Sequence, residues 1–166
     1  MIPLFLLGSP EDTSCADLLS RIFPHCGRKD TTKVLWEKNA EIFLMDGFSP
    51  AYLDAGGGIV IFKESFSEKY APRHLLHGYC IIPSKNSPAQ KLVQQSGLPV
   101  ITCGGSFDTL SLSCMQEQTI LTLREDIPSL DGTILSAGDF PLDFGCHDLY
   151  ASLSCGAVLL LMGKLK

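Results

Sequence analysis

The stretch LFLLGSPEDTSCADLLSRIF, residues 4–23, decides the fold class of this chain. Residues 2–7 form a continuous apolar run, which predicts a strand buried on both faces, and Gly8-Ser9-Pro10 ends that strand. Apolar residues then recur at helical spacing, at Leu18, Leu19, Ile22 and Phe23. The order strand, short polar loop, helix is typical of the start of an α/β domain.

The loop between this strand and helix has some of the residues that a phosphate-binding loop requires. Such a loop needs glycine so that backbone N–H groups can face phosphate, a lysine for the terminal phosphates, and Ser or Thr for Mg²⁺. Gly8, Thr13 and Ser14 are present, but Asp12 stands at the lysine position and follows Glu11. These carboxylates repel a triphosphate and complement the helix dipole, so the sequence favours a helix start capped by Asp12 or Thr13. A weak anion site at the helix N-terminus is the alternative.

The composition is that of a globular protein. Of the 166 residues, 45% are hydrophobic and 19% are charged, which suits one domain over residues 1–166. The formal net charge of −5 argues against nucleic acid or an anionic membrane as the main partner, because both reward a basic face. The expected partner is therefore a protein or a small molecule that the sequence does not identify.

The cysteines and the apolar runs predict a cytoplasmic location. The seven cysteines are scattered and form no CxxC, which argues against a disulfide framework or a zinc site. No basic region precedes the first apolar run, so we interpret that run as a strand and not as a signal peptide. The longest apolar run near the C-terminus, residues 157–162, is too short to span a bilayer.

Strands and helices alternate over residues 1–104. After the opening unit we expect a loop at 24–30 and strands at 33–36, 41–45, 59–62, 79–82 and 98–103. We also expect a polar helix over part of 67–76 and a helix at 88–95 with Gly97 as the C-terminal cap. This alternation predicts a mostly parallel sheet with flanking helices. Residues 105–145 then predict antiparallel hairpins, with strands at 109–115, 119–124, 133–135 and 140–143. In the C-terminal segment 146–166, a last helix is expected over roughly 147–162.

Two segments of the second half resemble the central, ATP-binding domain of the Mur ligases. The segment CIIPSKNSPAQKLVQQSGLPVITCG, residues 80–104, is similar to a family segment in which a strand ends in an Asn-x-Asp-Asp-like motif and is followed by a helix and a second strand. The tail FPLDFGCHDLYASLSCGAVLLLMG, residues 140–163, is similar to the family's strand, G-x-H-N-x-x-N segment and final helix. In this alignment LGSPEDTS, residues 7–14, falls at the family's G-T-N-G-K-T-T phosphate loop. The resemblance thus covers nearly the whole chain.

The resemblance implies ATP and Mg²⁺ as cofactors, but most of the family's functional positions are changed here. The phosphate-loop lysine is Asp12, and the Mg²⁺-binding glutamate falls near Asp46, which has a shorter side chain. The adenosine-contacting motif becomes residues 84–87, of which Ser84 and Asn86 keep polar side chains. The G-x-H-N-x-x-N segment keeps its histidine as His147. Around residues 63–67 the family's Asn and Asp-His are absent, and no lysine stands where a carbamylated one is expected.

These changes predict a domain without ligase activity. Acyl-phosphate formation needs a lysine and Mg²⁺ to neutralise charge on the transferring phosphoryl group. The family's domains for the UDP-sugar substrate and for the incoming amino acid also have no counterpart in these 166 residues. The resemblance therefore predicts a non-catalytic binding or regulatory module, connected with the cell wall only through the family.

The alternative is a nucleotide-binding or ligand-binding enzyme with a rebuilt site at the carboxyl ends of the parallel strands. The candidate ligand-binding residues are Gly8, Ser9, Asp12, Thr13, Ser14, Ser84, Asn86 and His147, with Asp46 as a candidate metal ligand. A filled crevice at these residues favours the binding module, whereas an open crevice in which Asp12, Asp46 and His147 converge favours the enzyme.

Two further groups of residues have simpler interpretations. Residues 103–106, CGGS, follow a strand and are interpreted as a plain turn in preference to an anion site. The cations Lys63, Lys69, Arg73 and Lys85 are interpreted as a solvated face.

Overall fold

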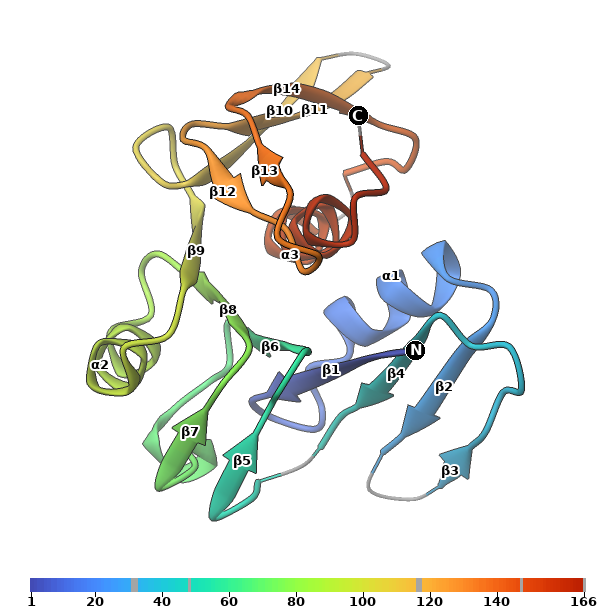
Figure 1. Cartoon of the computed structure of the whole chain (residues 1–166), viewed down its shortest axis with the longest axis vertical. Coiled ribbons are helices and arrows are strands. Elements are labelled where there is room, and N and C mark those ends of the chain that lie inside the picture. Colours follow the sequence, from blue (N-terminus) through green and yellow to red (C-terminus); the bar gives the residue numbers. More distant parts are fainter. Residues whose placement is uncertain (31–32, 48, 116–117, 147, 166) are drawn as a thin grey trace.

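A single sheet of ten strands organises the part of the chain that the structure describes (Figure 1). The computed structural model describes residues 1–30, 33–47, 49–115, 118–146 and 148–165. The strand order is β14-β11-β10-β9-β8-β6-β1-β4-β2-β3. The strands of this sheet are β1 (Ile2–Leu7), β2 (Cys26–Lys29), β3 (Val34–Leu35), β4 (Ile42–Met45), β6 (Ile59–Phe62), β8 (Tyr79–Pro83), β9 (Val100–Gly104), β10 (Leu110–Met115), β11 (Gln118–Leu123) and β14 (Gly138–Leu142).

The sheet is parallel in its centre and antiparallel at its ends. From β10 through β9, β8, β6, β1 and β4 to β2, each strand runs parallel to its neighbour. The pairs β10–β11 and β11–β14 are antiparallel at one end, and β2–β3 is antiparallel at the other. This arrangement confirms the predicted parallel sheet with an antiparallel extension from the C-terminal part of the chain.

Helices and two small sheets cover the faces of the large sheet (Figure 1). The remaining elements are α1 (Ser14–Ile22), α2 (Ser87–Ser96), α3 (Leu149–Leu161), the 3-10 turn η1 (Glu68–Tyr70), the parallel pair β5 (Tyr52–Asp54) and β7 (His74–Leu76), and the antiparallel pair β12 (Ile127–Pro128) and β13 (Ile134–Leu135). Because strand residues alternate between faces, Leu4 and Leu6 of β1 enter one core with α1 and α3. Phe5 and Leu7 enter a second core with β5, β7 and α2. Both faces of the central strands are therefore buried, as the continuous apolar runs predicted.

Helix α3 is buried along nearly its whole length, from Tyr150 to Leu161. It packs against α1 and against β8, β9 and β10. At Gly156 an added Cβ would lie 2.8 Å from a methyl carbon of Leu121, so glycine allows the helix to approach β11 closely. The helix begins after Asp148, whose Oδ1 accepts the backbone N–H of Ala151 at 2.7 Å.

Helix α2 has the ends that the sequence predicted. The Asn86 side chain accepts the N–H of Ala89 at the N-terminus, and Gly97 is left-handed, with a φ of 65°, at the C-terminus.

Among the described residues, no helix has the length and apolar character needed to cross a bilayer.

Two sequence predictions of local structure differ from the structure. Of the helix predicted within 67–76, only the short 3-10 helix η1 is present, and β7 follows it, because Pro72 cannot continue a helix and only Leu75 of β7 is buried. The predicted loop at 24–30 contains β2, which pairs in parallel with β4. The glycine of β2, Gly27, lies under the ring of Phe43, where an added Cβ would come within 2.5 Å of a ring carbon.

Tyr150 connects the first turn of α3 to the carboxyl ends of two central strands. The parallel register of β6 and β8 ends at Ile61 and Ile81. The buried Tyr150 hydroxyl donates to the carbonyl oxygen of Phe62 at 2.5 Å and lies 3.5 Å from that of Ile81. Burial raises the pKa of this phenol, which stays a hydrogen-bond donor. Tyr150 thus fills the gap where these two strands separate.

We expect Tyr150→Phe to lower the free energy of unfolding by about 1–2 kcal/mol, because it leaves a buried carbonyl oxygen without its donor. Urea denaturation followed by circular dichroism measures this change. Tyr52→Phe is the matched control, since the Tyr52 side chain is exposed on β5 and should change stability by less than about 0.5 kcal/mol. Equal stability of the Tyr150 variant and the wild type would contradict the role given to this hydroxyl.

Candidate functional site

The loop of residues 8–13 lies between β1 and α1, at the carboxyl edge of the parallel strands. Gly8 has a φ of 151°. A Cβ at Gly8 would lie 2.8 Å from the Cβ of Lys63 and 2.9 Å from the Oγ of Ser65. The segment that follows β6 therefore packs directly on the loop, and this contact requires glycine at position 8.

The backbone amides of the loop are hydrogen-bonded within the protein. The N–H of Ser9 donates to the Oγ of Ser65 at 3.1 Å. The N–H of Glu11 donates to the Oγ of Ser9 at 3.4 Å, and the N–H of Asp12 donates to the carbonyl oxygen of Ser9 at 3.2 Å. A phosphate-binding loop instead directs such amides at its ligand. These three amides are therefore already satisfied by the protein itself.

A buried lysine lies beneath the loop. The side chain of Lys63 has no exposed surface, and its Nζ lies 2.5 Å from the Oδ1 of Asp46 and 3.0 Å from the carbonyl oxygen of Ser9. The N–H of Gly47 donates to the same carboxylate oxygen at 2.7 Å, and Arg28 lies 4.0 Å from the other. The interpretation of Lys63 as part of a solvated face was wrong, because the residue directly continues the buried strand β6 and points inward.

The ammonium group of Lys63 occupies the surroundings of Asp46 that a metal ion would need. Asp46 was the candidate metal ligand, and its carboxylate now has a cation against one oxygen and a second cation near the other. Among the described residues, no three metal-ligating side chains gather in one place. A divalent cation would have to displace Lys63 to reach Asp46. Metal binding by Asp46 thus stays a prediction from the resemblance.

The polar side chains at the start of α1 have partners other than the helix amides. Asp12 accepts the hydroxyl of Ser65 at 2.7 Å, and Thr13 donates to Asp17 at 2.7 Å. Thr13 is the N-cap residue but makes no side-chain capping bond. Thr13 therefore stands at one of the two predicted N-cap positions, but the predicted capping by its side chain is absent. Ser14 lines a small cavity of about 230 Å³ between α1 and α3.

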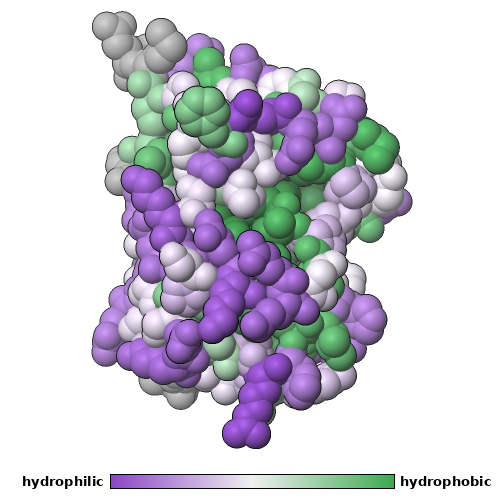
Figure 2. Space-filling view, turned by 90° about the vertical axis from the view of Figure 1, so that its left-hand side faces the viewer, coloured by the Kyte–Doolittle hydropathy of each residue, from purple (hydrophilic) through white to green (hydrophobic). Residues whose placement is uncertain are grey.

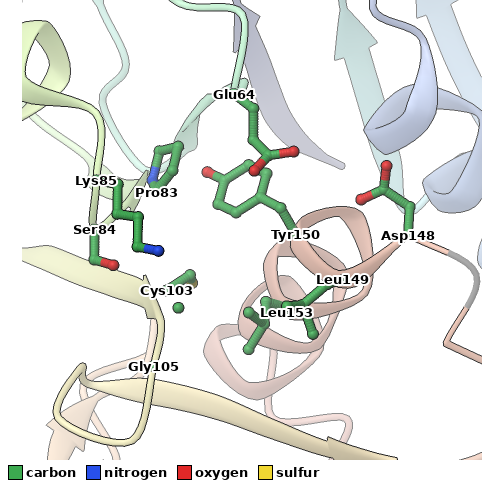
Figure 3. A pocket seen from close by; sticks show the side chains of 11 residues that line it. Glu64, Pro83, Ser84, Lys85, Cys103, Gly105, Asp148, Leu149, Tyr150 and Leu153 are labelled. Carbon is green, nitrogen blue, oxygen red and sulfur yellow. The ribbon is translucent and has the colours of Figure 1, made fainter.

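A second, open pocket of about 420 Å³ lies beyond the ends of β6, β8 and β9, against the start of α3 (Figure 3). We call it the Glu64 pocket. Its apolar lining includes Pro83, Tyr150 and Leu153, and its polar lining includes Ser84, Lys85, Glu64 and Asp148. On the face shown in Figure 2, hydrophobic residues gather in a hollow at mid-height, above a largely hydrophilic lower half.

Glu64 is a carboxyl group of this pocket with a shifted pKa. Partial desolvation raises the pKa of its carboxyl, and the negative charges of Asp148 and Asp12 raise it further. A carboxyl group with a perturbed pKa in a cleft is a candidate for ligand binding.

The structure separates the candidate residues into two groups. Gly8, Ser9, Asp12 and Thr13 form the closed loop, with Asp46 linked to it through Lys63. Ser84 lines the Glu64 pocket. The remaining candidates are Ser14, whose cavity is described above, Asn86 and His147.

Asn86 belongs to neither the loop nor the lining of the Glu64 pocket. Both ends of the Asn86 amide are engaged, because its Oδ1 caps α2 and its Nδ2 donates to the carbonyl oxygens of Phe66 and Glu64 at 3.0 and 3.3 Å. His147 lies outside the described residues.

Several residues that build the site were missed by the sequence analysis. Lys63, Glu64 and Ser65 follow the buried strand IVIF directly, and a position just after a parallel strand was the available signal. Tyr150 gave no signal, because an apolar helix predicts burial of its aromatic ring and not the partner of its hydroxyl.

Comparison with known proteins gives structural relatives but no sequence relatives. No family model and no curated protein sequence matches the chain. The UDP-N-acetylmuramoylalanyl-D-glutamyl-2,6-diaminopimelate–D-alanyl-D-alanyl ligase of Acinetobacter baumannii matches 98% of this chain and 43% of its own, with a TM-score of 0.54 at 14% identity. E. coli FolC, solved with DHPP and ADP, matches 98% of this chain and 53% of its own, with a TM-score of 0.57 at 11% identity.

The chain spans about half the length of these two solved proteins. At such low identity the likeness concerns the fold alone. It agrees with the element order, the mostly parallel sheet and the antiparallel extension described above. The chain therefore has a Mur-ligase-like α/β fold, that of the central domain of these enzymes.

Proposed function

We propose that this chain is a non-catalytic binding module in which the phosphate loop of a Mur-ligase-like fold is closed by the protein's own side chains. The observation that carries this proposal is the buried Lys63, which contacts both the loop carbonyl of Ser9 and the carboxylate of Asp46. The crevice at the loop is filled, and a filled crevice favours a binding module over a nucleotide-dependent enzyme.

Charge at the loop supports the same conclusion. Phosphoryl transfer relies on cations that neutralise the transferring group. Here the charge of Lys63 is balanced by Asp46, while Glu11 and Asp12 remain on the loop. An incoming triphosphate would meet carboxylates and amides that are already hydrogen-bonded, so binding would require the loop to reorganise.

The Glu64 pocket, at about 420 Å³, is larger than the Ser14 cavity at this edge and is open to a ligand. Within the proposal, this pocket or a protein-binding surface performs the function of the module. The setting of cell-wall metabolism comes from the A. baumannii ligase alone and is part of the proposal.

The second candidate function is an enzyme with a rebuilt site. The observation that favours it is the raised pKa of Glu64 in an open pocket, because a carboxyl group that titrates closer to neutral pH suits acid–base chemistry. The phosphate loop would take no part in such a reaction.

We expect isothermal titration of the purified chain with Mg²⁺-ATP to give no saturable heat up to millimolar nucleotide, because the loop amides and Lys63 are already engaged. Ser14→Ala is the variant that locates any binding, since Ser14 stands where the family's loop has a hydroxyl for Mg²⁺. Saturable binding that weakens in this variant would overturn the proposal, because it would show a working phosphate loop.

We expect Lys63→Met to lower the free energy of unfolding by about 3–5 kcal/mol, because it leaves the carboxylate of Asp46 buried without its main counter-ion. The matched control is Lys91→Met. Lys91 forms an exposed pair with Glu68, at 3.8 Å, and its loss should cost less than about 1 kcal/mol.

The double variant Lys63→Met, Asp46→Leu separates the charge effect from the loss of packing. We expect it to regain part of the lost stability, since both charges leave the interior together. Thermal and urea denaturation of the variants measure these differences. A Lys63→Met variant as stable as the Lys91→Met control would show that Lys63 does not hold the loop closed.

A further inference from the structure

The Glu64 pocket carries charges of both signs on opposite walls. Figure 3 shows Lys85 entering from the side of Ser84, whereas the carboxylates of Glu64 and Asp148 lie over the start of α3. These two acids come from different elements, the segment after β6 and the N-cap of α3. In this view the ring of Tyr150 lies beside Glu64, on the side that faces Lys85.

We propose that the Glu64 pocket binds a small primary amine, with its ammonium group between Glu64 and Asp148 and its apolar chain against Leu149. The proposal rests on the proposed function, because it takes this pocket as the ligand site of the binding module.

The size and lining of the pocket fit such a ligand. A volume of about 420 Å³ lies in the range of small-molecule sites, which combine an apolar lining with a few polar groups that fix orientation. Leu149 also lines the pocket, and its side chain is 53% exposed beside the buried side chains of Leu153 and Tyr150. A short alkyl chain gains free energy by covering this exposed apolar surface.

The charge balance selects a cation at the α3 end of the pocket. Asp148 uses one carboxylate oxygen to cap α3, and Glu64 stands partly desolvated near it. Lys63, the residue next to Glu64, points away and is paired with Asp46. Repulsion between Glu64 and Asp148 is therefore relieved by a ligand cation, and a phosphate or carboxylate placed there would increase it.

Lys85 distinguishes two classes of amine ligand, a simple alkylamine and an amine that also bears a carboxylate. A simple alkylamine uses only the carboxylate end of the pocket. An amine that also bears a carboxylate at the far end of its chain adds an ion pair with Lys85 across the pocket. The shared requirement is the ammonium group at Glu64.

The test is titration of the ¹⁵N-labelled chain with three probes of similar length, which are pentylamine, 5-aminopentanoate and pentanoate. We expect both amines to shift the backbone amide signals of Gly104, Gly105 and Asp148 in a saturable way, and pentanoate to leave them unchanged. Glu64→Gln should weaken amine binding about tenfold, the size expected for loss of a charged hydrogen bond. Glu68→Gln is the matched control, because Glu68 lies on η1 outside the pocket lining.

An amino-carboxylate ligand is supported if 5-aminopentanoate binds more tightly than pentylamine. In the Lys85→Gln variant its affinity should then fall to that of pentylamine. Equal binding of the two amines supports a simple amine. Equal binding of pentanoate, unchanged affinity in Glu64→Gln, or the absence of saturable shifts would each overturn the proposal. The outcome is independent of the Mg²⁺-ATP titration, which reports on the phosphate loop and not on Glu64.

Discussion

The buried ion pair between Lys63 and Asp46 is the interaction on which the carboxyl edge of the sheet depends. It joins the end of β6 to the end of β4, and through the carbonyl oxygen of Ser9 it also holds the loop after β1. Burial of two charges costs several kcal/mol for each ion, so the pair persists only because each charge has close partners. The same segment after β6 requires glycine at position 8, through Lys63 and Ser65, and accepts the N–H of Ser9 at the Oγ of Ser65.

A second side chain, that of Tyr150, closes the carboxyl edge of the sheet one strand further along. Tyr150 occupies the separation between β6 and β8 and bonds the carbonyl oxygen of Phe62. The crevice that a parallel sheet offers to ligands is thus closed at two neighbouring positions, first by an ammonium group and then by a phenol. What remains open lies beyond the ends of β8 and β9, where Ser84 and Lys85 face α3. The interior of the protein therefore decides where a ligand can bind.

The fold was predictable from the sequence to a greater degree than the site. Continuous apolar runs such as residues 59–62 predicted the buried central strands, and Asn86 with Gly97 marked both ends of α2. The short strands β2 and β5 gave no such signal, because their stability comes from pairing partners far away in the sequence. The burial of Lys63 was equally out of reach, since a lysine after a strand reads as exposed until its partner, here Asp46 seventeen residues earlier, is known.

A cation near the loop between β1 and α1 can have one of two roles, and the position of Lys63 distinguishes them. In a phosphate-binding loop the lysine lies on the loop itself and its charge is directed at the ligand. Here the loop position is Asp12, and the ammonium group comes from the end of β6 and is directed at a carbonyl oxygen and a carboxylate. In the proposed function, this charge stabilises the folded chain through its internal partners. Because the ammonium group and its partners are all internal, a phosphate would have to displace them to reach Lys63, whereas the neighbouring Glu64 pocket is open.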